Sequence, residues 1–323
     1  MADAKKIATR EAYGQFLVEY GAERKDLVVM NADLSGSNKT DGFEKAYPER
    51  FVECGIAEQD MLAEAAGIAH SGHVVAASSF AMFAAGRGYE IIRNTIAHTN
   101  ANVKVCATHG GITVGEDGAT HQPFEDIALM RGIPGMVVIN PADAVSSKAL
   151  LRQIFEMDGP AYARFGRSGV SAVYDESEAD LIELGKGFTL RGGNDATIFA
   201  TGIMVEKALE AADILKAEKI NCRVIDIHTI KPIDSDIIKK AAYETDYIVT
   251  VEEHSVIGGL GSAVAEVCAK RMPYDCISMI GFQDTFGESG KPDELLEKYE
   301  MTTQKIVEEV KKLIAFDARS MKR

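Results

Sequence analysis

Hydrophobic and polar positions in the first half of the chain alternate between the spacing of strands and the spacing of helices. Strand-like apolar runs lie at 27–31, 74–78, 103–107, 136–140 and 162–165. Helical spacing falls between them, at 9–20, after Glu58, at 89–98, and from a cap at Asn140-Pro141 to about 157. Strands that alternate with helices form a parallel sheet with both faces covered, so we expect a doubly wound α/β domain.

The second half of the chain also alternates strand-like and helix-like segments, over a shorter stretch. Strand-like runs lie at 196–200, 222–226, 247–251 and 276–280, and helix-like runs at 205–216, at 260–270, and from Pro292 and Thr302. The acidic stretch 174–180 and the turn cluster 191–195 separate the two halves. The sequence therefore predicts an α/β fold of two doubly wound domains, 1–172 and 193–323, with a linker at 173–192.

Composition narrows the class of ligand. The 323 residues are 46% hydrophobic and carry a net charge of -14, with no basic stripe. This argues against nucleic acid or an anionic membrane as the partner and favours a small molecule. The five cysteines are scattered without a CxxC pair, and no apolar run reaches the length of a membrane span. We therefore expect free thiols and a cytoplasmic location.

The stretch 108–123 is rich in polar and titratable side chains. It places two histidines and two acids on a glycine-rich loop directly after the predicted strand 103–107. Open α/β sheets bind ligands at the carboxyl ends of their strands, and glycine lets the backbone take positive φ near a ligand. A solvated turn is the plain alternative. A metal site is another, although the spacing matches no zinc signature, and its ligands would be His109, Glu116, Asp117 and His121.

Several segments, taken in order, resemble one family. They are Asn31-Ala-Asp-Leu-Ser-Gly-Ser-Asn-Lys-Thr40, Gly55-Ile-Ala-Glu-Gln59, Phe80-Ala-Met-Phe83, Gly115-Glu-Asp-Gly-Ala-Thr-His-Gln-Pro123 and Phe286-Gly-Glu-Ser-Gly290. In these segments the chain resembles the carboxyl-terminal half of a transketolase. That half comprises the pyrimidine-binding and C-terminal domains of a thiamine diphosphate enzyme. The resemblance covers nearly the whole chain.

The resemblance also implies a partner. In such enzymes a Gly-Asp-Gly motif in the amino-terminal half holds Mg²⁺ and the diphosphate, and this sequence has no Gly-Asp-Gly. The chain therefore looks like the β-type subunit of a split transketolase. Thiamine diphosphate would be its cofactor, an amino-terminal-half subunit would supply the Mg²⁺ ligands, and the assembly would be of the α2β2 kind with self-association. No metal ligands are expected on this chain.

Four residues match the family's cofactor-binding positions. The resemblance implies that Glu58 binds the pyrimidine N1′ and so promotes the imino form that deprotonates the cofactor. Phe83 would stack on the aminopyrimidine with Phe80 packed beside it, and Asp33 would lie near both rings of the cofactor. Without the resemblance, Glu58 reads as a helix N-terminal acid, the Phe-x-x-Phe spacing as core, and Asp33 as a turn residue.

Further residues match the family's substrate-binding positions. A sugar phosphate needs cations and hydrogen-bond donors at the pocket mouth, and the matching residues are Arg10, Ser37, His109 and Arg164. Arg164 lies in an apolar strand, where an unpaired arginine is costly, so a partner or ligand is favoured, with Arg167 as the nearby substitute. Asp117 and His121 match positions that bind sugar hydroxyls, and His121 also assists proton transfer.

The implied activity is transfer of a two-carbon ketol unit from a ketose phosphate to an aldose phosphate, as in pentose phosphate metabolism. Ala57 stands where transketolases usually have arginine, and Ala57-Glu-Gln59 resembles the corresponding motif of deoxyxylulose phosphate synthases. A split synthase of that kind and a 2-oxoacid dehydrogenase E1 β subunit are therefore the alternative enzymes. A non-catalytic scaffold is the alternative of another class, and an intact Glu58 argues against it.

Overall fold

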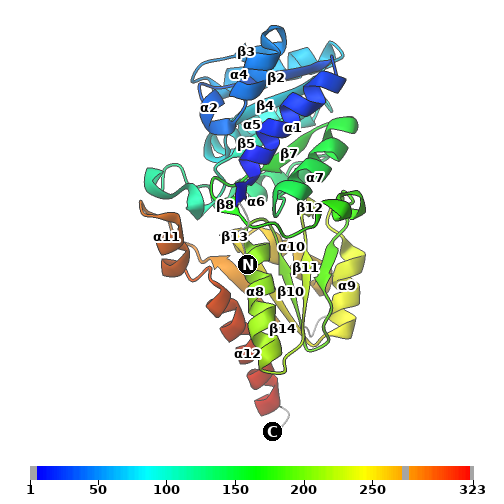
Figure 1. The fold of residues 1–323 in the computed structure, drawn as a ribbon, viewed down its shortest axis with the longest axis vertical. Helices are drawn as coiled ribbons and strands as arrows, with labels where there is room; N and C mark the ends of the chain where they lie inside the picture. The colour runs from blue at the N-terminus through cyan, green and yellow to red at the C-terminus, as the bar shows by residue number, and fades with distance from the viewer. Residues whose placement is uncertain (1–5, 271–275, 321–323) are drawn as a thin grey trace.

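The computed structural model describes residues 6–270 and 276–320 and has two α/β units arranged end to end (Figure 1). Two sheets, of seven and five strands, form the centres of the units, and a two-stranded ribbon accompanies them. The α/β class expected from the alternating pattern is confirmed.

The first unit holds most of the elements that carry the expected site. Its strands are β1 (Ile7–Ala8), β2 (Leu27–Asn31), β3 (Phe51–Glu53), β4 (Val74–Phe80), β5 (Val103–Thr108), β6 (Val137–Ile139), β7 (Ala161–Arg164) and β8 (Gly169–Val170). Its helices are α1 (Thr9–Glu23), α2 (Ser35–Asn38), α3 (Asp41–Ala46), α4 (Glu58–His70), α5 (Tyr89–Ile91), α6 (Asp126–Arg131) and α7 (Ala144–Glu156). The unit also has two 3₁₀-helical segments, η1 (Pro48–Arg50) and η4 (Ile112–Asp117), and two π-helical segments, η2 (Met82–Arg87) and η3 (Ile92–Ala97).

The second unit follows a short helical segment, η5 (Glu176–Leu181). Its strands are β9 (Phe188–Arg191), β10 (Ala196–Ala200), β11 (Cys222–Asp226), β12 (Thr229–Lys231), β13 (Tyr247–Ser255) and β14 (Cys276–Phe282). Its helices are α8 (Met204–Ala217), α9 (Ser235–Glu244), α10 (Leu260–Ala269), α11 (Pro292–Lys298) and α12 (Thr303–Ser320).

The two large sheets are parallel except at one edge each. The first has the order β12-β6-β7-β5-β4-β2-β3, and the second β14-β13-β10-β11-β9. Strand β12 pairs antiparallel with β6, and β9 pairs antiparallel with β11. The purely parallel sheet predicted from the sequence is therefore wrong at these edges. Both edge strands are short, three or four residues, and too short to give a periodic signal.

Strand β12 also joins the two units. It comes from the second half of the chain, yet Thr229 pairs with Ile139 and Lys231 with Val138 in the first sheet. Strand β9 lies inside the stretch that we expected to be a linker. The pairing of β12 with β6 holds the two units together. This matters because residues of both units contact the loop after β5.

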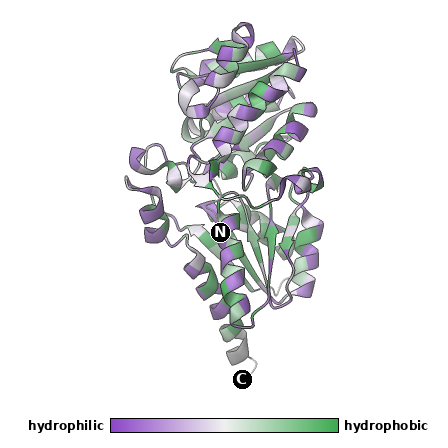
Figure 2. Cartoon of the chain, viewed as in Figure 1, coloured by the Kyte–Doolittle hydropathy of each residue, from purple (hydrophilic) through white to green (hydrophobic). Residues whose placement is uncertain are grey.

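Apolar side chains fill the space between each sheet and its helices. Figure 2 shows hydrophobic residues along the strands and mixed character on the outer helices. Val29, Val75 and Val105 in neighbouring strands are fully buried. Burial of each such side chain contributes about 1.5–3 kcal/mol, so this core fixes the strand ends from which the site loops leave.

Two local predictions need correction. Helix α7 is capped by Asp143, whose side chain accepts a hydrogen bond from the Ser146 amide, and Asn140-Pro141 lies before the cap. Strand β5 runs to Thr108, one residue beyond the predicted 103–107, and is buried at every position. Lys104 can be buried there because its Nζ donates to the carbonyls of Met157 and Gly159, at 3.0 and 2.5 Å.

Candidate functional site

The expected site residues lie on loops at the carboxyl ends of neighbouring parallel strands. Asp33 follows β2, Glu58 follows β3, Phe83 follows β4 and His109 follows β5. Because parallel strands place their carboxyl ends at one edge, these four loops converge, as the position of ligands in open α/β sheets requires.

The loop after β5 takes backbone conformations that its glycines permit. Gly111, Gly115 and Gly118 all have positive φ, and so does His109, at 59°. A side chain on Gly111 would collide with the carboxyl of Glu253, which accepts a hydrogen bond from the Thr113 amide at 2.7 Å. The close approach of the second unit therefore requires glycine at that position.

Glu58 is the first residue of α4, and its side chain is 2% exposed. Its Oε2 accepts a 2.7 Å hydrogen bond from Nη1 of Arg87. The same guanidinium lies 5.2 Å from the ring centroid of Phe83. A buried carboxyl, a cation and an aromatic face thus meet at the start of α4.

The aromatic rings of this edge form one cluster. The rings of Phe80 and Phe83 are nearly parallel, with centroids 6.1 Å apart. Phe80 also stacks on His109 at 3.8 Å, and the edge of His121 meets Phe83 at 5.2 Å. Phe83 is only partly buried, whereas Phe80 is 7% exposed. A flat ring bound over Phe83 would therefore lie close to both histidines.

Asp33 is exposed and has a positive φ of 56°. Its amide donates to Oε1 of Glu53 at 2.7 Å, and the amide of Gly55 donates to the same oxygen at 2.9 Å. Glu53 therefore ties the loop that carries Asp33 to the loop that leads into Glu58. Its role is invisible in the sequence because it depends on two loops that meet only in the fold.

Arg10 carries the positive charge on one side of the site, and His109 contacts it. Nη1 of Arg10 donates to the carbonyl of Ser37 at 2.9 Å and lies 3.1 Å from Nε2 of His109. Burial, and then the charge of Arg10, lowers the pKa of His109 to about 3. His109 is therefore neutral near pH 7 and accepts the Arg10 hydrogen bond through Nε2.

Arg164 lies elsewhere than expected. It is 3% exposed, and its Nε donates to Oδ2 of Asp126 at 2.8 Å while its Nη2 donates to the carbonyl of Glu253 at 3.0 Å. Burial lowers its pKa, but the charges of Asp126 and Glu253 raise it further, above the ordinary value. The expected place at the pocket mouth is corrected: the costly buried charge is stabilised by a carboxylate of this chain.

Arg167 is three residues further along and remains partly exposed, at 35%. Its Nη1 donates to the carbonyl of Val114 and, at 2.8 Å, to Oε2 of Glu116. Its charge contributes to the lowered pKa values of both Arg10 and His109. Arg167 therefore lies within electrostatic range of these two residues.

Asp117 and His121 occupy the open side of the loop. Asp117 is exposed and has no partner within residues 6–270 and 276–320, while Nδ1 of His121 lies 2.9 Å from the Thr120 hydroxyl. Between them and the core, Gln122 donates to the carbonyls of Ile112, Gly115 and Glu288. Gln122 thereby fastens the loop to the segment that precedes α11, which packs on η4 (Figure 1).

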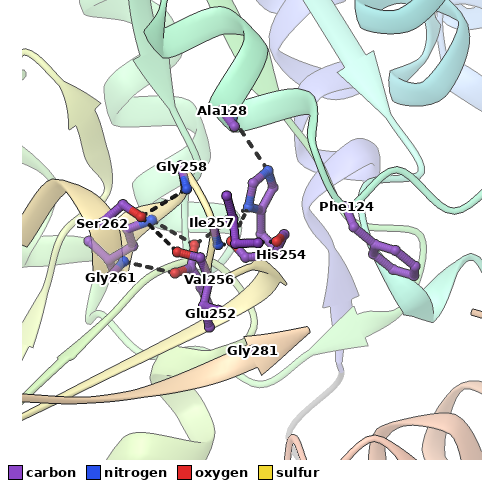
Figure 3. A network of polar contacts seen from close by, with 12 residues as sticks. Phe124, Ala128, Glu252, His254, Val256, Ile257, Gly258, Gly261, Ser262 and Gly281 are labelled. Atoms are coloured by element: carbon purple, nitrogen blue, oxygen red, sulfur yellow. Dashed lines mark hydrogen bonds and ion pairs between the residues drawn. The ribbon is translucent and has the colours of Figure 1, made fainter. Parts of the chain in front are cut away.

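A buried polar network lies behind the loop at the junction of the units (Figure 3). The Glu252 carboxyl accepts from the amides of Leu260 and Gly261 at the start of α10, and burial raises its pKa to about 7. His254 donates from Nδ1 to the Ser255 carbonyl, and its Nε2 lies 3.4 Å from the Ala128 amide. Burial lowers its pKa to about 4, so this network needs no charged histidine.

Metal ligands and membrane spans were searched within residues 6–270 and 276–320. No group of three or more His, Cys, Asp or Glu side chains could hold a metal ion there, and His109, Glu116, Asp117 and His121 do not form one. None of the helices in the same ranges is both long and apolar enough to cross a bilayer.

Two sequence profiles cover most of the chain. Residues 5–171 match the transketolase pyrimidine-binding domain, and residues 185–306 match the transketolase C-terminal domain. The architecture and the converging loops thus define a two-domain α/β protein of the pyrimidine-binding class. The chain belongs to the transketolase family.

Relatives include both short subunits and full-length enzymes. A protein of Methanocaldococcus jannaschii, provisionally named a transketolase C-terminal section, is 51% identical over 94% of this chain and 96% of its own length. The 6-deoxy-6-sulfo-D-fructose transketolase subunit of Clostridium sp. (strain MSTE9) is 40% identical over 92% of each chain. Human transketolase is 34% identical over 96% of this chain, which spans only 49% of that enzyme.

A solved structure has the same architecture. A split gene transketolase, described as an inactive β4 tetramer, superposes with a TM-score of 0.89 at 50% identity, over 96% of this chain and 99% of that one. The expected resemblance to the carboxyl-terminal half of transketolases, and to the β subunit of a split one, is confirmed.

Proposed function

We propose that this chain is the β-type subunit of a two-subunit, thiamine-diphosphate-dependent transketolase that moves a two-carbon ketol unit between phosphorylated sugars. The single observation that carries the proposal is the buried Glu58 carboxyl paired with Arg87, whose guanidinium also lies over the partly exposed ring of Phe83, at the edge where the site loops converge. Membership of the transketolase family supports this use of the pair.

The residues present fit the aminopyrimidine end of the cofactor. Glu58 offers a carboxyl oxygen for a protonated ring nitrogen, and Phe83 offers a flat apolar face with Phe80 behind it. Asp33 lies on the adjoining loop, which Glu53 ties to Gly55 in the loop that leads into Glu58. When bound, thiamine diphosphate supplies the carbon nucleophile and electron sink that ketol transfer needs.

The side chains of this chain then have distinct tasks. Glu58 holds a proton at the pyrimidine nitrogen, and the neutral His109, whose Nε2 accepts from Arg10 and whose Nδ1 contacts the Thr108 hydroxyl, orients the Arg10 side chain. His121, against Phe83, is placed to hold hydroxyls of the donor sugar and to move a proton. Asp117, exposed and unpaired within the described residues, accepts a hydroxyl of the acceptor.

The anionic end of the substrate belongs on the opposite side of the loop. Arg10 supplies the positive charge for a phosphate there, with the neutral His109 and Ser37 beside it. Relatives support an anionic end group, because one is named for a sulfonated ketose and another, from Phocaeicola vulgatus, for apulose 4-phosphate.

The magnesium and diphosphate ligands come from a partner subunit of the amino-terminal-half type. Two relatives support this assignment: the transketolase C-terminal section of Methanocaldococcus jannaschii and the split gene transketolase structure match this chain over 96% and 99% of their own lengths. The similar split-gene structure, described as inactive in its β4 form, is consistent with a need for that partner.

Reconstitution tests the proposal. The chain alone should transfer no ketol unit from xylulose 5-phosphate to ribose 5-phosphate, and addition of the amino-terminal-half subunit, Mg²⁺ and thiamine diphosphate should create the activity. Turnover by the chain alone would contradict the split arrangement. Condensation of pyruvate with glyceraldehyde 3-phosphate in place of ketol transfer would indicate the deoxyxylulose phosphate synthase alternative. Acyl transfer from a 2-oxoacid to a lipoyl acceptor would indicate the E1 β alternative.

A further inference from the structure

The second unit packs against the loop that follows β5 at three glycines, all of which have positive φ. The pairs are Gly111 with Glu253, Gly115 with Pro292, and Gly118 with Ser289. A Cβ on the first or the third glycine would overlap the facing side chain, and one on Gly115 would lie 3.3 Å from the proline ring. The second unit therefore determines the path of this loop, because a larger residue does not fit at these contacts.

Gln122 holds the end of the loop against the same unit. It is 2% exposed, and its Nε2 donates to the carbonyls of Ile112, Gly115 and Glu288 at 3.4, 3.2 and 2.9 Å. A Cβ on Gly287 would overlap Oε1 of Gln122 and would also lie 2.9 Å from the Ile112 side chain. One buried amide thus joins the loop to the second unit, and it fits there because residue 287 is glycine.

The segment 286–292, which leads from β14 into α11, is fixed to its own unit. Tyr299, directly after α11, donates from its hydroxyl to the Phe286 carbonyl at 3.1 Å. Its ring lies 4.9 Å from that of Phe282, and Phe282 stacks on Phe124 at 3.6 Å. Phe124 follows Gln122 by two residues, so aromatic packing supports the same contact from the other side.

The side chains proposed to bind substrate and cofactor are held by different parts of the fold. Asp117 and His121 lie on the loop after β5, each between two points at which the second unit contacts it. The Glu58 carboxyl is held inside the first unit, where it pairs with Arg87 at 2.7 Å. A change in the segment 286–292 should therefore move the substrate-binding side chains and leave Glu58 in place.

We propose that the second unit sets the substrate preference of the enzyme through Gln122 and Gly287, which position the loop that carries Asp117 and His121. Gln122 is buried and Gly287 has no side chain, so neither contacts the substrate and both are positioning residues. The inference rests on the proposed function for the roles of Asp117 and His121. It deepens that function by giving the second unit a task in substrate recognition.

The test uses the enzyme assembled with its partner subunit and compares Gly287→Ala with Gly192→Ala. Gly192 is an exposed glycine of the same unit with open space around it. Gly287→Ala should lower kcat/KM for ketol transfer from xylulose 5-phosphate to ribose 5-phosphate about ten- to hundredfold, because a displaced loop misaligns the substrate. It should also narrow the preference for ribose 5-phosphate over 2-deoxyribose 5-phosphate. Hydrogen–deuterium exchange at C2 of the bound cofactor should stay at the wild-type rate.

Gln122→Met is the second variant, since it keeps the length of the side chain and removes the donor. It should show the same selective loss, and its combination with Gly287→Ala should lose less than the two losses added, because both act through one side chain. A loss of C2 exchange in parallel with ketol transfer would indicate damage to the whole chain and overturn the proposal. Ketol transfer by Gly287→Ala at the level of Gly192→Ala would overturn it as well.

Amide hydrogen exchange separates this inference from the proposed function. In Gly287→Ala and Gln122→Met, the amides of residues 111–121 should exchange faster than in wild type, while those of α4 should not change. If the wild-type assembly transferred no ketol units, the proposed function would fall, and the exchange of the loop would still decide whether the second unit positions it. Equal loop exchange in wild type and Gly287→Ala would refute that role.

Discussion

Nη1 of Arg87 lies 2.7 Å from Oε2 of Glu58, so the carboxyl proposed to meet the cofactor is already held by a cation of the next strand-to-helix connection. Arg87 is 49% exposed and also faces the ring of Phe83. It thus orients both groups that would contact the aminopyrimidine.

Replacement of Arg87 by methionine should weaken cofactor binding. Because the Arg87 end of this pair is 49% exposed and screened by solvent, we expect its loss to cost about 1 kcal/mol and the dissociation constant of thiamine diphosphate to rise by no more than about fivefold. Titration of the assembly with the cofactor measures it. Arg93→Met is the control, because Arg93 is an exposed arginine of η3 that donates to Asn94. Tighter binding in Arg87→Met would mean that Arg87 competes with the cofactor for Glu58.

Glu58→Gln should abolish most activity while leaving much of the cofactor binding intact. A neutral amide can accept a hydrogen bond but cannot share a proton with the ring nitrogen, and loss of such a role costs roughly 10²–10⁴-fold. Hydrogen–deuterium exchange at C2 of the bound cofactor measures the step directly. Asp60→Asn, exposed on the same helix, should exchange normally. Normal exchange in Glu58→Gln would remove Glu58 from its proposed role.

Asp117→Ala should narrow the preference between acceptors that differ at the 2-hydroxyl. A carboxylate that accepts this hydroxyl is left unpaired when the hydroxyl is missing, so the wild type should prefer ribose 5-phosphate to 2-deoxyribose 5-phosphate. The variant should lose more kcat/KM on ribose 5-phosphate than on the deoxy sugar. An unchanged ratio would assign Asp117 to the shape of the loop.

Arg164→Met should destabilise the chain. Among the described residues it leaves the Asp126 carboxylate, 1% exposed, with the Tyr162 hydroxyl at 2.7 Å as its remaining side-chain hydrogen-bond donor, and an uncompensated buried charge costs about 3–5 kcal/mol. Removal of that charge in Arg164→Met/Asp126→Asn should restore part of the loss. Urea unfolding of wild type, Arg164→Met, Asp126→Asn and the double variant gives the coupling energy between the two side chains. Independent, additive effects would show that the pair contributes nothing beyond its separate side chains.

Asp226 should make stability depend on pH at the junction of the units. Burial raises its pKa to about 8, and Tyr174 donates to its Oδ2 at 2.7 Å. An unfolded aspartate titrates near 3.9, so between these values the native state holds a proton that the unfolded state has lost. The contribution is fully present below about pH 4 and is lost as the pH rises through about 8.

Wild type should therefore lose stability relative to Asp226→Asn across this window, by on the order of 5 kcal/mol. Urea unfolding from pH 4 to 9 measures the difference. Asp180→Asn, an exposed acid in η5, should run parallel to wild type. Parallel curves for Asp226→Asn would mean that Asp226 is ionised throughout.

Several features of the fold followed from local patterns. The strand predicted at 27–31 has the bounds of β2, and Glu58 begins α4 as expected. The glycines of the loop after β5 do take positive φ at three positions. These features are local: a run of apolar residues, a helix start and a flexible backbone each leave their signal within a few residues.

The sequence by itself determined the two α/β units, the family resemblance and which loops hold the polar side chains of the site. Only the tertiary structure decided the partners of those side chains. Arg164 and Arg167 look alike in sequence, yet one pairs with a buried carboxylate 38 positions away and the other stays partly exposed. The ion pair of Arg87 with Glu58 and the pairing of β12 with β6 could not be predicted from the sequence either. The reason is physical: hydrogen bonds and ion pairs depend on distances of a few ångströms between segments that only the packed fold brings together.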